Sequence, residues 1–128
     1  MAFQFDLVSP ERRLASFEAA EVQIPGADGD MTAMPDHSLV ITTLRPGVLR
    51  AIGNDGEKAY AVTGGFAEIT PGGASVLAER AMPLSEVTGE IMDVLISDAK
   101  AAAADAAGDA KDAADKLVAD YEALKAAV

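Results

Sequence analysis

The chain has 128 residues, half of them apolar and 24% charged, a composition typical of one globular domain or of one domain with a small appendage. Cysteine is absent, which excludes disulfides, thiolate zinc sites and thiol catalysis. The formal net charge of −11 argues against nucleic acid or an anionic membrane surface as partner, because both are bound by clustered lysine and arginine.

The sequence also gives no sign of membrane insertion. Its start, MAFQFDLVSPERR, lacks a basic segment followed by an apolar one, so it does not resemble a signal peptide. No apolar run approaches the roughly 20 residues that span a bilayer. We therefore expect a soluble chain that reaches a membrane only through a partner.

Up to Pro83, the chain has the pattern of short strands joined by turns. Phe3, Phe5 and Leu7 alternate with polar residues, as in a half-buried strand, and residues 38–44 (SLVITTL) are rich in β-branched side chains. Residues 25–30 (PGADGD) are expected to form a loop on composition alone.

Turn signals follow one another closely in the same part of the chain. Residues 54–56 (NDG) predict a tight hairpin, residues 64–65 (GG) a kink or bulge, and residues 71–73 (PGG) a last hairpin. Such signals recur about every 8–12 residues with no helix between them, which predicts an antiparallel sandwich or barrel.

After Pro83 the pattern becomes helical. Ser85 is a candidate N-cap, and an apolar face follows it, which comprises Val87, Ile91, Val94 and Leu95. Gly108 suits the left-handed residue that ends a helix. The next helix has a narrow seam at steps of three and four, formed by Ala110, Ala114, Leu117, Tyr121, Leu124 and Val128. An antiparallel helical hairpin results, with arms roughly 30 Å long, which has to dock elsewhere or move.

No set of residues indicates catalysis. His37 is the single histidine, and neither Asp30 nor Asp36 is well spaced to build a metal site with it, so a loop or interface role is favoured. Residues 61–66 (AVTGGF) contain the glycines of a phosphate loop but not its lysine. We expect a binding or structural module with no catalytic residue, no metal and no cofactor.

Three segments together resemble one known family. They are FDLVSPER (residues 5–12), IPGADGDMTAMPDHSLVITTLRPG (24–47) and YAVTGGFAEITPGGASVLAERA (60–81). Their order and spacing, with a two-helix ending, resemble the epsilon subunit of F-type ATP synthases, which corresponds to the delta subunit of the mitochondrial enzyme. The resemblance is strong up to Ala81 and rests on architecture and position beyond it.

The resemblance implies an α+β fold, an N-terminal ten-stranded antiparallel β-sandwich followed by a C-terminal antiparallel two-helix hairpin. Residues 1–83 would form the rotor-binding domain and residues 84–128 a hairpin with a regulatory role. The subunit would be non-catalytic. It would link the gamma subunit to the c ring in the central stalk and couple proton flow to ATP synthesis. A bacterial member would lie on the cytoplasmic face of the inner membrane, held there by the complex.

Carried over by position, the resemblance also implies partner-binding residues. Asp30 and Met31 would face the polar loops of the c ring, and Ser9 and His37 would lie on the side that faces gamma. The chain departs from the family at Thr32, where a further glycine is usual. It departs again at residues 38–39, where the family has Ala-Pro after the histidine.

The tail of this family can fold against the sandwich or extend into the alpha/beta catalytic head and obstruct ATP hydrolysis. In some members an acid-x-x-Arg-Ala element helps to bind ATP, but here LSEVTGEI has Glu86 and then Gly89 in place of the arginine. Residues 84–128 also carry ten acids and four lysines. We therefore expect at best a weak inhibitor of hydrolysis.

Two other classes stay open at this point. One is a stand-alone nucleotide-sensing module of the same fold, which the missing arginine disfavours. The other is a small hydrolase on a β-sandwich, which the missing catalytic residues disfavour. Both predict a free small protein, whereas the rotor subunit predicts co-migration with a large membrane-attached ATPase.

Overall fold

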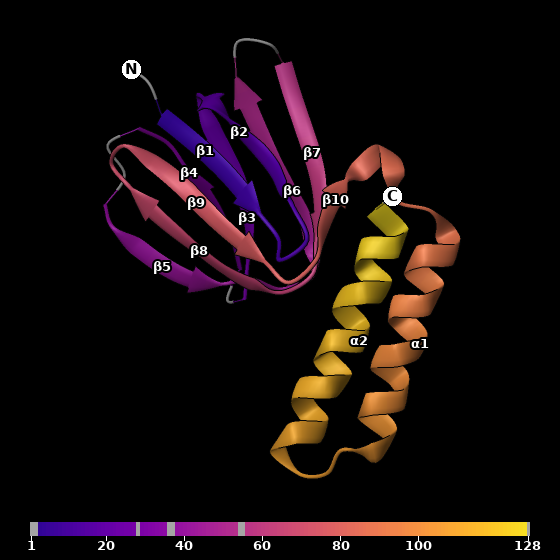
Figure 1. Ribbon diagram of the computed structural model, residues 1–128. Coiled ribbons are helices and arrows are strands. Elements are labelled where there is room, and N and C mark those ends of the chain that lie inside the picture. Colours follow the sequence, from indigo (N-terminus) through magenta and orange to yellow (C-terminus); the bar gives the residue numbers. More distant parts are fainter. Residues whose placement is uncertain (1–2, 28, 36–37, 54–55, 128) are drawn as a thin grey trace.

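The computed structural model describes residues 3–27, 29–35, 38–53 and 56–127 (Figure 1). Ten strands are followed by a short 3₁₀ turn, η1, and two helices. Their bounds are β1 (Phe3–Val8), β2 (Arg13–Ala19), β3 (Glu21–Gly26), β4 (Gly29–Ala33), β5 (Val40–Thr43), β6 (Gly47–Gly53), β7 (Gly56–Val62), β8 (Gly65–Thr70), β9 (Gly73–Ala78), β10 (Ala81–Pro83), η1 (Leu84–Glu86), α1 (Gly89–Asp105) and α2 (Asp109–Ala127).

The strands form two five-stranded sheets. Sheet A has the order β2-β1-β9-β8-β5 and sheet B the order β10-β7-β6-β3-β4. Neighbouring strands are antiparallel with one exception, the parallel pair β1 and β9. The predicted class, a β-sandwich followed by two helices, is confirmed.

The alternation in β1 determines which of its side chains enter the core. Phe3, Phe5 and Leu7 are fully buried between the sheets, while their polar neighbours face outward. Phe5 meets Phe17 of β2 edge-on, with the ring centroids 5.4 Å apart, and approaches Tyr60 of β7 on the opposite sheet. The aromatic contacts thus join β1 to both a neighbouring strand and the second sheet.

Two of the predicted turns have the expected glycine geometry. Strands β6 and β7 pair to Gly53 and Gly56, so the predicted hairpin is present, although its residues 54–55 lie outside the described part of the chain. Gly65 has a φ of +118°, and a Cβ there would lie 2.0 Å from the carbonyl oxygen of Leu77. Only glycine fits at that position.

The expected loop at residues 25–30 is largely wrong, because β3 runs through Gly26 and β4 begins at Gly29. Pro25 pairs with Asp30 across this tight hairpin. The Pro25 carbonyl accepts a hydrogen bond from the Arg45 N–H, at 3.0 Å, on the side away from β4. The missing proline N–H therefore removes no bond between β3 and β4, and a proline is tolerated here.

The first helix starts later than predicted. Ser85 lies in η1, and the N-cap of α1 is Thr88, whose hydroxyl accepts a hydrogen bond from the Ile91 N–H at 3.2 Å. The predicted apolar face is wrong at one position: Val94 is 58% exposed, and Met92 is buried instead, while Leu95 is buried and Val87 and Ile91 pack against the same cluster. The other buried residues of α1 are Leu95, Ala99 and Ala103.

The turn between the helices and the seam of α2 are partly as predicted. Gly108 has a φ of +64°, the left-handed conformation, although α1 already ends at Asp105. On α2, Leu124 is buried and Tyr121 partly so, while Leu117 is 38% exposed and Val118 is more covered than expected.

The hairpin meets the sandwich in the half that lies toward its open end (Figure 1). Met92, Leu95 and Leu124 form an apolar cluster with Ala61 of β7. Because Val48, Ala61 and Met82 pair in register, they form one row on the outer face of sheet B, and this row is covered by the helices. The loop end of the hairpin extends away from the sandwich (Figure 1).

Candidate functional site

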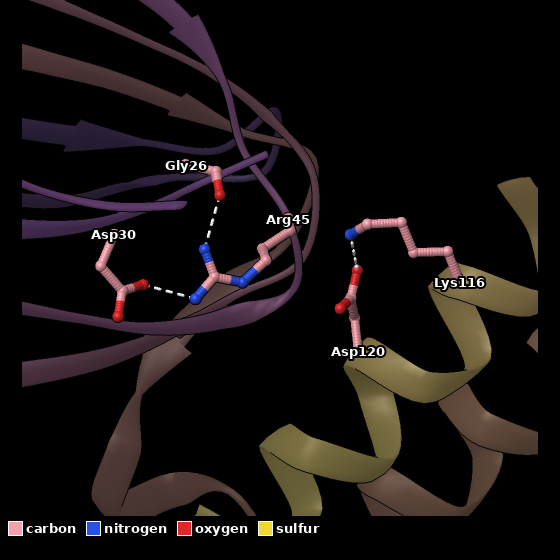
Figure 2. Close-up of polar contacts among 5 residues, drawn as sticks. All are labelled: Gly26, Asp30, Arg45, Lys116 and Asp120. Atoms are coloured by element: carbon pink, nitrogen blue, oxygen red, sulfur yellow. Dashed lines mark hydrogen bonds and ion pairs between the residues drawn. The ribbon is translucent and has the colours of Figure 1, made fainter. Parts of the chain in front are cut away.

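The first candidate surface is the end of the sandwich formed by the β3–β4 hairpin. Asp30 is on β4 with its side chain 81% exposed, and its carboxylate forms an ion pair with the guanidinium of Arg45 (Figure 2). Met31, the next residue, is directly opposite Ile24 and packs against the core. The two predicted c-ring residues thus lie together, but Asp30 faces solvent and Met31 faces inward.

Of the two residues predicted to face gamma, Ser9 is buried in a turn and His37 is not described. Ser9 is buried at the end of β1, where its hydroxyl donates to the Arg12 carbonyl at 3.3 Å and accepts from the Arg12 N–H at 3.4 Å. These bonds hold the turn between β1 and β2. His37 lies outside the described residues, so its predicted role is not located in the structure.

An apolar surface that was not predicted lies beside Ser9 on the outer face of sheet A. Val8, Leu77 and Phe66 are paired in register across β1, β9 and β8, and Ile41 of β5 lies in the next row. We call these four residues the outer patch. Phe66 is 47% exposed, Leu77 46% and Ile41 67%. The signal was available in the alternation of β8, where a large aromatic side chain takes an outward position next to Glu68.

The outer face of sheet B differs, because the helical hairpin covers part of it. Tyr121 of α2 lies against Thr63, Glu79 and Arg80 at this contact. Burial raises the pKa of Tyr121 and the charge of Glu79 adds to the rise, while Arg80 and a hydrogen bond with Thr63 oppose it. The phenol therefore stays neutral at physiological pH.

The tail lysines are paired within the tail. Each has an acidic partner within 4.0 Å: Lys125 with Asp93 at 2.6 Å, Lys116 with Asp120 at 2.9 Å (Figure 2), Lys111 with Asp115 at 3.7 Å and Lys100 with Glu122 at 4.0 Å. Two of these pairs, Lys125–Asp93 and Lys100–Glu122, join α1 to α2. All four are exposed pairs, which contribute on the order of 1 kcal/mol or less each.

Neither a metal centre nor a membrane span is found in the described part of the chain. Among the residues that the structure describes, no group of three or more histidine, aspartate and glutamate side chains is placed to hold a metal ion. Within the same residues, neither helix is long and apolar enough to cross a bilayer.

Comparison with known proteins identifies the family. The sequence profile of the ATP synthase delta/epsilon chain, beta-sandwich domain, matches residues 2–84. The chain belongs to the ATP synthase delta/epsilon family. It is 63% identical over 124 residues to the ATP synthase epsilon chain of Fuscovulum blasticum, which covers 97% of this chain and 94% of the relative. It is 68% identical over 110 residues to the ATP synthase epsilon chain of Jannaschia sp. (strain CCS1). That match covers 84% of this chain and 83% of the relative. The resemblance noted in the sequence is confirmed.

Solved structures show the same fold. One similar chain is in the cryo-EM structure of Euglena gracilis mitochondrial ATP synthase, OSCP/F1/c-ring, in rotational state 1. The TM-score is 0.75 and the identity 22%, over 98% of this chain and 81% of that one. Another is in the cryo-EM structure of the central stalk and c-ring of Tetrahymena thermophila mitochondrial ATP synthase. The TM-score is 0.66 and the identity 15%, over 99% of this chain and 96% of that one.

Proposed function

We propose that this epsilon chain is a non-catalytic rotor subunit of the central stalk, which links gamma to the c ring and couples proton flow to ATP synthesis. Family membership supports the assembly, because the curated relatives are named ATP synthase epsilon chain. The two similar structures are of mitochondrial assemblies that include a c-ring, and one of them is of the central stalk. In this role the chain performs no chemistry, and its surfaces have to hold rotor parts together.

The outer patch is the observation that carries the proposal. Exposed apolar patches rimmed by polar residues mark protein interfaces, and aromatic side chains contribute strongly to binding. Glu68 and Asp6 border the patch on one side, and Ser9 adjoins it on the other. Because the hairpin covers part of sheet B, sheet A is the face left for gamma. Ser9 then shapes the rim of that interface.

The β3–β4 hairpin binds the c ring in this proposal. Its exposed carboxylate at Asp30 fits a polar loop that offers hydrogen-bond donors. Met31 supports the hairpin from the core side. With the chain attached in this way, it lies on the cytoplasmic face of the bacterial inner membrane and is peripheral to it.

The charge of the tail is consistent with weak inhibition of ATP hydrolysis. Residues 84–128 carry ten acids and four lysines, and each lysine already has an acidic partner inside the hairpin. An extended tail would have to break the two pairs that join α1 to α2 before it offered those lysines to the alpha/beta head. We propose that residues 84–128 rest on sheet B and that residues 1–83 bind the rotor.

A single substitution in the outer patch tests the proposal. Phe66→Asp places a charge at the centre of the patch without touching the core, so the isolated chain should fold normally by circular dichroism. Its affinity for gamma, measured by calorimetry, should fall at least tenfold, or about 1.4 kcal/mol. Val94→Asp, at an exposed apolar position of α1, is the matched control. Unchanged affinity for Phe66→Asp would mean that gamma binds another face.

A further inference from the structure

Arg45 connects two segments at the end of the sandwich that we assign to the c ring. It follows β5, and its side chain is 27% exposed. One nitrogen of the guanidinium donates to the Gly26 carbonyl at 2.5 Å, and the other donates to Oδ1 of Asp30 (Figure 2). A single side chain thus contacts both strands of the β3–β4 hairpin.

The backbone brings the same two segments together. The Arg45 N–H donates to the Pro25 carbonyl at 3.0 Å, and the Ala27 N–H donates to the Thr43 carbonyl at 2.9 Å. Packing is tight here, since a Cβ on Gly47 would lie 2.8 Å from the Pro25 ring. The turn end of the hairpin is therefore held without the guanidinium, and what the guanidinium adds is a contact to the Asp30 side chain.

Only one oxygen of that carboxylate is occupied. Oδ2 of Asp30 accepts no hydrogen bond from any residue that the structure describes, and the side chain is 81% exposed. A carboxylate in solution samples several rotamers and loses this freedom when a partner binds. In the unbound chain the contact with Arg45 favours one of these rotamers. The planar fork of arginine can bond a carbonyl and a carboxylate together, which a lysine ammonium does less well.

We propose that Arg45 is a positioning residue for the c-ring contact. It holds Asp30 by Oδ1 and leaves Oδ2 directed outward for a hydrogen-bond donor, a guanidinium, ammonium or amide, on the polar loop of the partner. The proposal rests on the assignment of this end to the c ring. The part of the proposal in which Arg45 holds the Asp30 carboxylate concerns the isolated chain, and it can be tested there.

The first experiment uses the isolated full chain. Three-bond scalar couplings report the χ1 rotamer of Asp30, and we expect one rotamer in the unaltered chain. Arg45→Met should give averaged couplings, and Arg45→Lys an intermediate result. The control is Arg12→Met, which breaks the exposed Arg12–Glu86 pair elsewhere on the chain and should leave Asp30 unchanged. A single Asp30 rotamer in folded Arg45→Met and Arg45→Lys chains would overturn the positioning role.

The second experiment uses the assembled enzyme. Thr32 is exposed and shares the outward face of β4 with Asp30, so a cysteine placed there by Thr32→Cys can be crosslinked to a cysteine in the polar loop of subunit c. Adding Arg45→Met should lower the yield several-fold, and adding Arg45→Lys should restore part of it. Equal yields would overturn the positioning role alone. No crosslink with Arg45 intact would overturn the c-ring assignment, while the rotamer measurement would still decide whether Arg45 fixes Asp30.

Discussion

Replacing Leu124 with alanine should release the helical hairpin from sheet B and leave the sandwich folded. Leu124 is 3% exposed and contacts a small cluster, whose other buried members are Ala61, Met92 and Leu95. The sandwich core is a separate cluster that includes none of these residues. The substitution therefore removes one of the three large buried side chains that the hairpin contributes to this cluster, and nothing from between the sheets.

The size of the effect follows from the burial. Buried Leu→Ala substitutions cost about 2–5 kcal/mol, and the lower end applies where the surroundings can collapse into the space. The cluster is small and lies between the helices and the outer face of one sheet, where the surroundings can close in, so we take about 2 kcal/mol. That value corresponds to a roughly 30-fold change in the ratio of docked to undocked hairpin.

Hydrogen exchange read by mass spectrometry measures both parts at once. Amides of α1 and α2 should exchange about 30-fold faster in Leu124→Ala, if exchange follows undocking, and amides of the ten strands should not change. Val94→Ala is the control, because Val94 is 58% exposed on the same hairpin and its truncation should have little effect.

Two results would refute this reasoning. Equal acceleration in the strands would show that the hairpin and the sandwich unfold as one cooperative unit. No acceleration anywhere would show that the contacts around Leu124 do not hold the hairpin.

Four further predictions follow from the same structure. Gly65→Ala should destabilise the sandwich by more than about 2 kcal/mol in urea unfolding, because a backbone oxygen lies 2.0 Å from the new Cβ, whereas Gly72→Ala meets open space and should have little effect. A chain that ends at Ser85 should give the circular dichroism of a folded β protein and still bind gamma; an unfolded product would contradict the two-part organisation. Calorimetry should detect no sub-millimolar ATP binding, because Gly89 supplies no charge. Deleting residues 85–128 in the native complex should raise ATP hydrolysis less than tenfold, and a larger rise would show that the acidic tail inhibits.

Much of the sandwich could be predicted because local signals and tertiary contacts agree there. Alternation in β1 matches the buried face, and the hairpins at Gly56 and Gly73 occur where turn residues interrupt apolar runs. The order of strands within the sheets could not be derived in this way. The parallel pair of β1 and β9 joins segments that are more than 60 residues apart, and no local pattern encodes that pairing.

The wrong predictions concern segments whose sequence is compatible with two local structures. Pro25 and Gly26 have turn composition, yet they continue β3, because they pair with Asp30 and Gly29 of β4 and the missing proline N–H removes no bond to β4. Pairing with β6 on the other side stops earlier, at Gln23. Ser85 and Thr88 are both good caps, and the chain uses the second because Leu84–Glu86 first forms a 3₁₀ turn. Propensity alone does not rank such alternatives.

The candidate surfaces were predicted less completely than the fold. The resemblance indicated Asp30 by position, but the role of Arg45 depends on a contact 15 residues away that only the folded chain shows. The outer patch likewise depends on strand order, since Phe66 and Leu77 become neighbours only when β8 pairs with β9. The alternation within a strand predicts which side chains point outward, but it does not predict which side chains of other strands lie next to them.

A cryo-EM structure of the assembled enzyme from the same organism tests the central claim most directly. The account predicts that gamma covers the outer patch, with Phe66 and Leu77 excluded from solvent, and that the Asp30 end of the sandwich lies on the polar loops of the c ring. A structure in which the outer face of sheet A is open to solvent, or in which that end points away from the membrane, would contradict it.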